Sequence, residues 1–147
     1  MKTEGQGNHM KVMAIDYGDA RTGVAISDAL GWMTGQTTVI HSWKPEKTAE
    51  EVARLLRESG AERLVMGFPR NMDGTEGPRA ALYREFAALL EQTTGMKPVL
   101  WDERRTTIDA HNILFNSGKN AKQRKKVVDA VAASLILEGY LTFKKGH

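Results

Sequence analysis

Short runs of apolar and β-branched residues fill the first third of the chain. They lie at Lys11–Asp16, Thr22–Asp28 and Thr37–His41, and glycine-containing turns separate them. Runs of this length bounded by turn residues are typical of strands, and strands that follow one another closely pair with their neighbours. The pattern predicts a three-stranded antiparallel meander.

After His41 the apolar period lengthens to that of helices. Helices are expected at Thr48–Ser59 and from Pro78 to near Gly95, and strands at Leu64–Phe68 and Pro98–Trp101. A capping-box pattern opens a further helix from Thr106 towards Phe115, and a last helix runs to about Leu141. The apolar stripes expected to be buried are Val52, Leu55 and Leu56 in the first helix, Leu82, Phe86, Leu89 and Leu90 in the second, and Val128, Val131, Ala132 and Leu135 in the last.

The order of these elements predicts an α/β fold. A meander followed by strand–helix–strand crossovers gives a mixed sheet flanked by helices. The chain has 147 residues, which suits one domain with one core. His9 and Met10 resemble a cloning junction, so we interpret residues 1–9 as a remnant of expression and residues 10–147 as a single domain.

Composition narrows the class of protein. Hydrophobic residues make up 41% and charged residues 27% of the chain, as in an ordinary globular protein. No apolar run approaches the roughly 20 residues that span a bilayer. Cysteine is absent, which excludes disulfides, thiolate metal sites and a cysteine nucleophile. These features favour a cytoplasmic protein.

Positive charge is concentrated in one segment. Residues 104–126 carry seven basic side chains and one acid, a net charge of +6 in a chain whose total is +3. The remainder of the chain is therefore acidic, at −3. Such a segment favours a polyanionic partner such as nucleic acid, and the alternative is a solvated loop and helix face.

Three acids occupy positions where folding alone gives little reason for an acid. Asp16 ends the first strand, Glu103 follows the last strand, and Asp129 lies in the final helix beside its apolar stripe. Carboxylates gathered at strand ends suit a hard cation such as Mg²⁺ or Mn²⁺, and two such ions can promote phosphodiester hydrolysis. The alternatives are structural: Asp16 caps a turn, and the other two acids pair with neighbouring basic residues.

Four sequence blocks resemble the YqgF/RuvX family, in the order in which that family has them. They are Asp16–Asp28, Gly67–Gly77, Asp102–Thr107 and Lys126–Ala133, and the resemblance extends from Met10 to about Leu141. It implies a ribonuclease H-like fold in a bacterial cytoplasmic nuclease. The family has been interpreted both as the nuclease that matures the 5′ end of pre-16S ribosomal RNA and as a Holliday junction resolvase. We expect the first of these activities.

The resemblance also assigns roles to residues. Asp16, Glu103 and Asp129 match the family's acidic positions and are the expected catalytic residues and Mg²⁺ or Mn²⁺ ligands. Related resolvases carry their second acid after the fourth strand, where this chain has Pro69, Arg70 and Asn71. Glu103 must therefore reach the site from the neighbouring strand, and Asp102 and Asp73 are its substitutes.

Other polar residues are expected to contact substrate. Basic side chains near the three acids can contact the phosphates of a nucleic-acid strand. Such contacts position the nucleic acid without recognising its base sequence. Gly18 and Gly23 are expected where the backbone turns tightly near the metal and a phosphate. His41 and His111 are interpreted as structural, and Trp101 and Trp32 are expected in the core rather than stacked on bases. The expected nucleic-acid-binding residues are Arg21, Asn71, Arg104, Lys119, Lys122, Arg124 and Lys125.

Two other functions compete with the nuclease. A nucleic-acid-binding factor that assembles ribosomal precursor particles would keep the basic segment and use the acids only structurally. An actin-like ATPase also places Asp-x-Gly after a strand, but such enzymes normally need two such domains. The expected partners are precursor ribosomal RNA, branched DNA and ribosomal precursor particles, with no membrane, and the sequence leaves the oligomeric state open.

Overall fold

A five-stranded mixed sheet lies at the centre of the computed structural model, which describes residues 10–71, 73–103 and 121–145. The strands β1 (Val12–Asp16), β2 (Arg21–Ser27) and β3 (Thr34–His41) form an antiparallel meander. The strands β4 (Arg63–Phe68) and β5 (Val99–Asp102) then add in parallel to the other edge of β1. The spatial order is β3-β2-β1-β4-β5, so the predicted meander with crossovers is confirmed.

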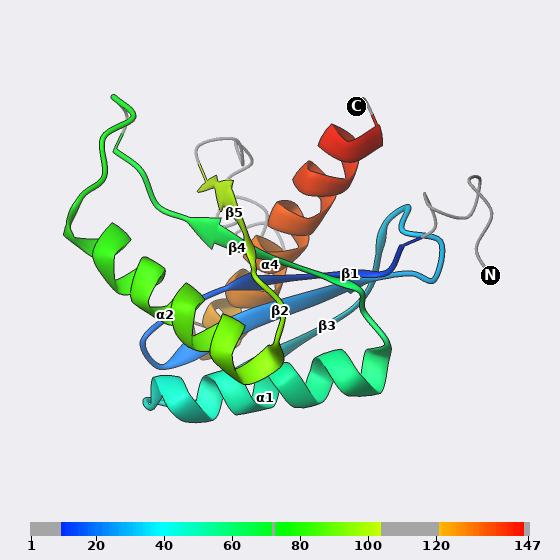
Figure 1. The fold of residues 1–147 in the computed structure, drawn as a ribbon, viewed down its shortest axis with the longest axis horizontal. Helices are drawn as coiled ribbons and strands as arrows, with labels where there is room; N and C mark the ends of the chain where they lie inside the picture. The colour runs from blue at the N-terminus through cyan, green and yellow to red at the C-terminus, as the bar shows by residue number, and fades with distance from the viewer. Residues whose placement is uncertain (1–9, 72, 104–120, 146–147) are drawn as a thin grey trace.

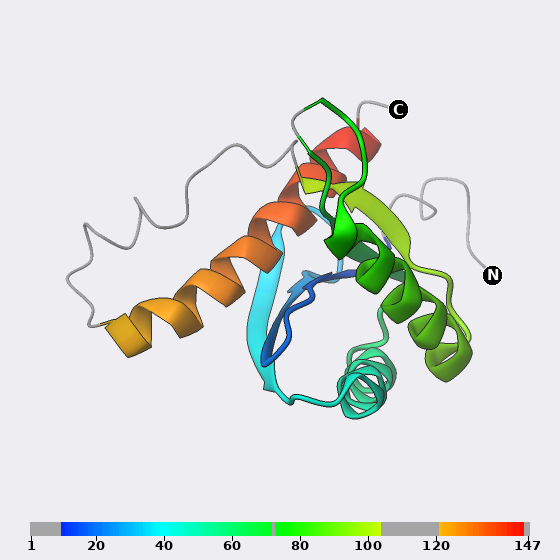
Figure 2. The ribbon, with the colours of Figure 1, turned by 90° about the vertical axis from the view of Figure 1, so that its left-hand side faces the viewer.

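The helices cover the two faces of this sheet. The helices α1 (Pro45–Ser59) and α2 (Pro78–Thr94) pack on one face, and α4 (Ala121–Lys145) crosses the other face over β1, β2, β3 and β4. Figures 1 and 2 show these three layers, with α4 on the opposite side of the sheet from α1 and α2. The final helix therefore passes over the strand that ends in Asp16.

Local sequence explains where the first two helices begin and end. Pro45 and Pro78 stand in their first turns, where the missing N–H costs no hydrogen bond. Gly60 and Gly95 end them with φ of 74° and 75°, a left-handed conformation that suits glycine. The first helix begins at Pro45, three residues before the expected start, because the proline pre-sets the helical φ.

Side chains on β1 alternate between two separate cores. Met13 and Ile15 pack towards α1 and α2, whereas Val12 and Ala14 pack towards α4. Because successive side chains of a strand point to opposite faces, Asp16 lies on the same face as Val12 and Ala14. The first predicted acid thus points to the layer that contains the final helix.

Three expectations about burial were wrong. On α4 the buried residues are Ala133, Ile136, Leu137, Tyr140 and Leu141, whereas Val131, Ala132 and Leu135 are only half-buried. This helix is apolar on several sides, so the periodicity did not select the face. Leu82 on α2 is 51% exposed and Trp32 is 56% exposed, although Trp101 is buried as expected.

Candidate functional site

Asp16 stands at the end of β1 between two glycines. Gly23 pairs with it from β2, and Ile15 pairs with Met66, which places Gly67 of β4 on its other side. Without side chains at these two positions, the sheet leaves room on both sides of the Asp16 carboxyl. Each of the other two predicted acids enters through one of these spaces.

Glu103 enters over Gly67. It directly follows β5, and a Cβ atom at Gly67 would lie 2.7 Å from its Oε1 atom. Its carboxylate accepts a hydrogen bond from the Asp16 carboxyl. β4 lies between β1 and β5. Glu103, which follows β5, therefore reaches Asp16 across β4, because the β4 residue at this point is Gly67, which has no side chain.

Burial and crowding change the charge of this pair. Burial first, and then the negative charges of Glu103 and Asp129 together with the hydrogen bond to Glu103, raise the pKa of Asp16 from 3.8 to about 8. Burial also raises the pKa of Glu103. At neutral pH the pair holds a proton on Asp16, since two buried carboxylates in contact do not both ionise.

Asp129 enters over Gly23. The backbone carbonyl of Asp129 lies where a Cβ atom of Gly23 would be, so α4 reaches the sheet here only because residue 23 is glycine. The carboxylate of Asp129 is 20% exposed and accepts a hydrogen bond of 2.8 Å from Arg21 Nε. Asp129 lies on the side of α4 that faces the sheet, one and two turns before the buried Ala133 and Ile136. The sequence had predicted it beside the buried side of the helix instead.

The three acids differ in what they contact. Asp16 and Glu103 share a proton, and Asp129 pairs with Arg21. Among the described residues no three His, Cys, Asp or Glu side chains stand together in a ready-made metal-binding group. The donor set nevertheless fits a hard divalent cation, because it offers carboxylate oxygens and buried negative charge that is only partly neutralised.

Arg79 partly neutralises the pair, and the sequence analysis missed it. It lies in the first turn of α2, and its positive charge lowers the pKa of Asp16 and of Glu103. Its guanidinium donates to the Tyr83 hydroxyl at 3.3 Å, and that hydroxyl donates to the Tyr17 carbonyl at 2.6 Å. A positive side chain is unfavourable at a helix N-terminus, which already carries partial positive charge. Arg79, directly after Gly77 and Pro78, could therefore have been recognised from the sequence as a residue with a role other than stabilising the helix.

The expected substitutes for Glu103 have other surroundings. Asp102 points to the opposite face of the sheet from Trp101, and its carboxylate lies 3.9 Å from Arg70 Nε. Asp73 accepts hydrogen bonds from the backbone N–H and the hydroxyl of Thr75. Asn71 also bonds Thr75, so this segment has the turn chemistry that competes with a substrate role.

The remaining predicted residues are divided between the described and undescribed parts of the chain. A Cβ atom on Gly18 would clash with the Arg21 carbonyl, which supports the expected tight turn. Outside the described residues lie Arg104, Lys119, His111, the helix expected from Thr106 and the side chains of Lys122, Arg124 and Lys125. Within the described chain, none of the helices combines the length and hydropathy that crossing a bilayer requires.

Solved structures with the same arrangement define the class of fold. The chain is similar to Thermus thermophilus RuvC in complex with a Holliday junction substrate, with a TM-score of 0.59 at 15% identity over 92% of this chain and 97% of that one. A second Thermus thermophilus RuvC structure matches with a TM-score of 0.52 and the same coverage. The fold is therefore ribonuclease H-like, as expected from the sequence.

Sequence comparison then defines the family. Residues 10–143 match the family model RuvX, described as a Holliday junction resolvase. A relative from Carboxydothermus hydrogenoformans named "Putative pre-16S rRNA nuclease" is 45% identical, covering 92% of this chain and 98% of its own. One of the same name from Halothermothrix orenii is 42% identical over 92% and 96%. The chain belongs to the RuvX family, a group of hydrolases that act on nucleic acids.

Proposed function

We propose that this protein is a metal-dependent endonuclease that matures the 5′ end of pre-16S ribosomal RNA in the cytoplasm, with Asp16, Glu103 and Asp129 as its catalytic residues. One observation carries the proposal. Two half-buried carboxyl groups are in contact at the end of β1, and two flanking glycines admit Glu103 on one side and the backbone of Asp129 on the other. A folded core gains nothing from such an arrangement, since buried acids without a cation are costly.

The chain's own residues prepare this site for a cation. Mg²⁺ or Mn²⁺ bound to these carboxylates would supply the Lewis acid that activates water and stabilises the leaving oxygen. Asp16 would hold the cation in its ionised form, because carboxylate ligands must be deprotonated. Glu103 is already oriented by its contact with Asp16, and Arg21 orients Asp129 through the Nε hydrogen bond.

Two cations of the protein lie beside the acids and fit a phosphate. Arg21 is 37% exposed and has further N–H donors beyond the one that binds Asp129. Arg79 is near enough to the acids to lower their pKa values. These guanidinium groups would hold the phosphates of the substrate strand against a site that is otherwise negative.

The choice of substrate rests on the relatives. Those most similar in sequence carry the name of a pre-16S rRNA nuclease, whereas the family model is described as a Holliday junction resolvase. We therefore take precursor ribosomal RNA, free or in ribosomal precursor particles, as the substrate. The four-way DNA junction is the second candidate.

A cleavage assay tests both substrates at once. Labelled precursor ribosomal RNA and a labelled four-way junction are incubated with wild type, Asp16→Asn and Glu138→Gln, with Mg²⁺, with Mn²⁺ and with EDTA. Glu138 is an exposed acid on α4, so its variant controls for the loss of a carboxylate elsewhere. We expect RNA cleavage by wild type and Glu138→Gln only when metal is present, and none by Asp16→Asn.

Other outcomes would replace this proposal. Metal-dependent cutting of the junction alone would assign the resolvase activity. Equal cleavage by Asp16→Asn would exclude the three-acid mechanism. Binding of RNA without cleavage by any variant would favour the non-catalytic assembly factor.

A further inference from the structure

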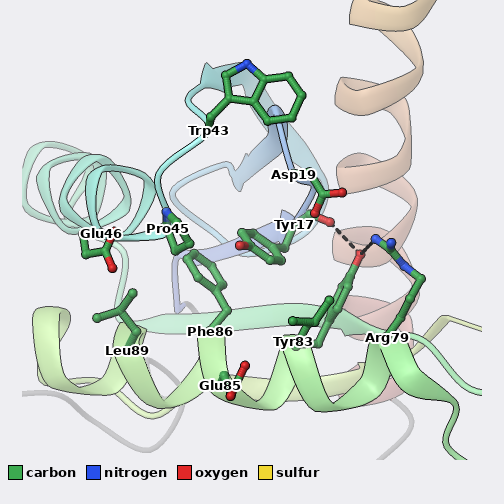
Figure 3. Close-up of a pocket in the computed structure, with 11 residues that line it drawn as sticks. Tyr17, Asp19, Trp43, Pro45, Glu46, Arg79, Tyr83, Glu85, Phe86 and Leu89 are labelled. Atoms are coloured by element: carbon green, nitrogen blue, oxygen red, sulfur yellow. Dashed lines mark hydrogen bonds between the residues drawn. The ribbon is translucent and has the colours of Figure 1, made fainter.

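A pocket of about 530 Å³ opens next to the proposed catalytic residues. It lies between the turn after β1, the start of α1 and α2, and Tyr17, the residue after Asp16, forms part of its lining. Figure 3 shows these side chains, with Arg79 and Tyr83 at the end of the pocket near the turn that follows β1. Its volume falls within the range of small-molecule binding sites.

Aromatic rings form the base and one side of the pocket. The rings of Tyr17 and Phe86 are stacked, with centroids 3.8 Å apart and planes 10° apart. Trp43 stands over them on the segment between β3 and α1, and its side chain is 78% exposed. Leu82, which the helical pattern had predicted to be buried, also lines the pocket and is 51% exposed.

The charges of the pocket are divided. Arg79 lies at the end nearest the catalytic acids, with the Asp19 carboxylate close enough to act on it, and Glu46 lines the other end of the pocket at the start of α1. Asp19 and Glu46 both lie close enough to Tyr17 to act on its hydroxyl electrostatically. The pocket therefore offers the Arg79 guanidinium to a phosphate and the carboxylates of Asp19 and Glu46 to N–H donors.

We propose that this pocket binds one unpaired purine base of the substrate strand, next to the phosphate that is cleaved. The base stacks against Trp43, its N–H groups donate to the pocket carboxylates, and its phosphate contacts Arg79. Guanine is the best match, because its N1–H and N2–H groups can donate together to one carboxylate. This inference rests on the proposed action on nucleic acid. It adds that binding of one base in this pocket positions the substrate strand relative to the catalytic acids.

An exposed tryptophan beside carboxylates suits a base better than other occupants. Bases stack on aromatic side chains in single-stranded complexes, and each stacked base contributes strongly to binding. The pocket approaches the catalytic acids at two of its lining residues, because Tyr17 directly follows Asp16 in the chain and the charge of Arg79 acts on Asp16 and Glu103. A peptide segment or a second copy of the chain has no such connection to the acids.

Binding measured without cleavage tests this inference independently of the catalytic activity. Fluorescence anisotropy of labelled UUGUU and UUUUU RNA is recorded in EDTA for wild type, Trp43→Leu and Trp32→Leu. Trp32 is a matched control, since it is 56% exposed and absent from the pocket. We expect Trp43→Leu to weaken UUGUU binding about tenfold and Trp32→Leu to leave it unchanged. Glu46→Gln should reduce the preference for UUGUU over UUUUU.

The opposite results overturn the inference. Unchanged UUGUU binding by Trp43→Leu, with cleavage intact, would exclude the base pocket and leave the nuclease standing. Equal weakening by Trp43→Leu and Trp32→Leu would indicate a nonspecific apolar effect. A change in oligomeric state of Trp43→Leu with unchanged RNA binding would assign the surface to a second copy. Absence of RNA cleavage by wild type, with UUGUU binding still weakened in Trp43→Leu, would remove the proposed nuclease activity and leave the base pocket standing.

Discussion

Asp16 and Glu103 form a hydrogen-bonded carboxyl pair although they belong to strands that are not neighbours. β4 lies between β1 and β5, and Glu103 crosses it above Gly67, where a side chain would take up its space. The pair is half-buried, and the pKa of Asp16 rises to about 8. The predictions below follow from this crowded group of acids.

Asp16→Asn should stabilise the metal-free protein. The folded state raises the pKa of Asp16 from 3.8 to about 8. Between these pH values the folded protein keeps a proton that the unfolded chain loses, so folding becomes less favourable as the pH rises from about 4 to about 8. Asparagine removes this cost, and we expect the free energy of unfolding to rise by about 1–3 kcal/mol at pH 8. Thermal unfolding in EDTA at several pH values measures the gain, which should shrink towards pH 4. A gain that does not depend on pH would contradict this origin, and Glu138→Gln should show no gain.

Divalent cations should stabilise the wild-type protein in the same assay. At ten times its dissociation constant, a ligand that binds only the folded state adds about 1.4 kcal/mol. Protons compete for the carboxylates, so the increase in Tm with Mg²⁺ should be larger at pH 8 than at pH 5. The increase should disappear in Asp16→Asn and persist in Glu138→Gln. An equal increase in Asp16→Asn would place the cation elsewhere.

Gly67→Ala should damage activity more than stability. The added Cβ would lie 2.6 Å from Ile136 Cδ1 and 2.7 Å from Glu103 Oε1, so both flexible side chains must shift. Displacing Glu103 from Asp16 should lower kcat about 10- to 100-fold. Gly139→Ala is the control: its Cβ would crowd the Trp101 ring at 3.2 Å without touching an acid. Comparable kcat values for the two variants would show that Glu103 does not need this space.

Arg21→Met should weaken RNA binding in a way that depends on salt. Removing one phosphate contact reduces the slope of log affinity against log salt by about 1. Its ion pair with Asp129 is partly exposed, so the free energy of unfolding should fall by less than about 1 kcal/mol. Arg54→Met is the matched control, because Arg54 pairs with Glu51 and Glu58 on the exposed side of α1. An unchanged salt slope for Arg21→Met would mean that Arg21 only orients Asp129.

Local patterns predicted most of the fold. The five described strands and the first two helices were expected within a few residues, because turn glycines and the prolines that begin helices act over short distances. The buried face of α4 was not predicted, since several of its sides are apolar and only contact with the sheet selects Ile136 and Leu137 over Leu135. Leu82 and Trp43 likewise became pocket residues through the placement of α1 and α2.

The sequence by itself determined which acids are candidates, their family resemblance and the succession of strands and helices along the chain, as distinct from the spatial order of the strands in the sheet, because each depends on residues close together in the chain. Only the tertiary structure decided how the acids meet. Glu103 reaches Asp16 because Gly67 lies between them, and Asp129 reaches the sheet because Gly23 admits the backbone of α4. Arg79 joins them from α2, some sixty residues from Asp16 in the chain. Such contacts depend on strand order and on empty space above glycines, and neither is encoded in a local pattern.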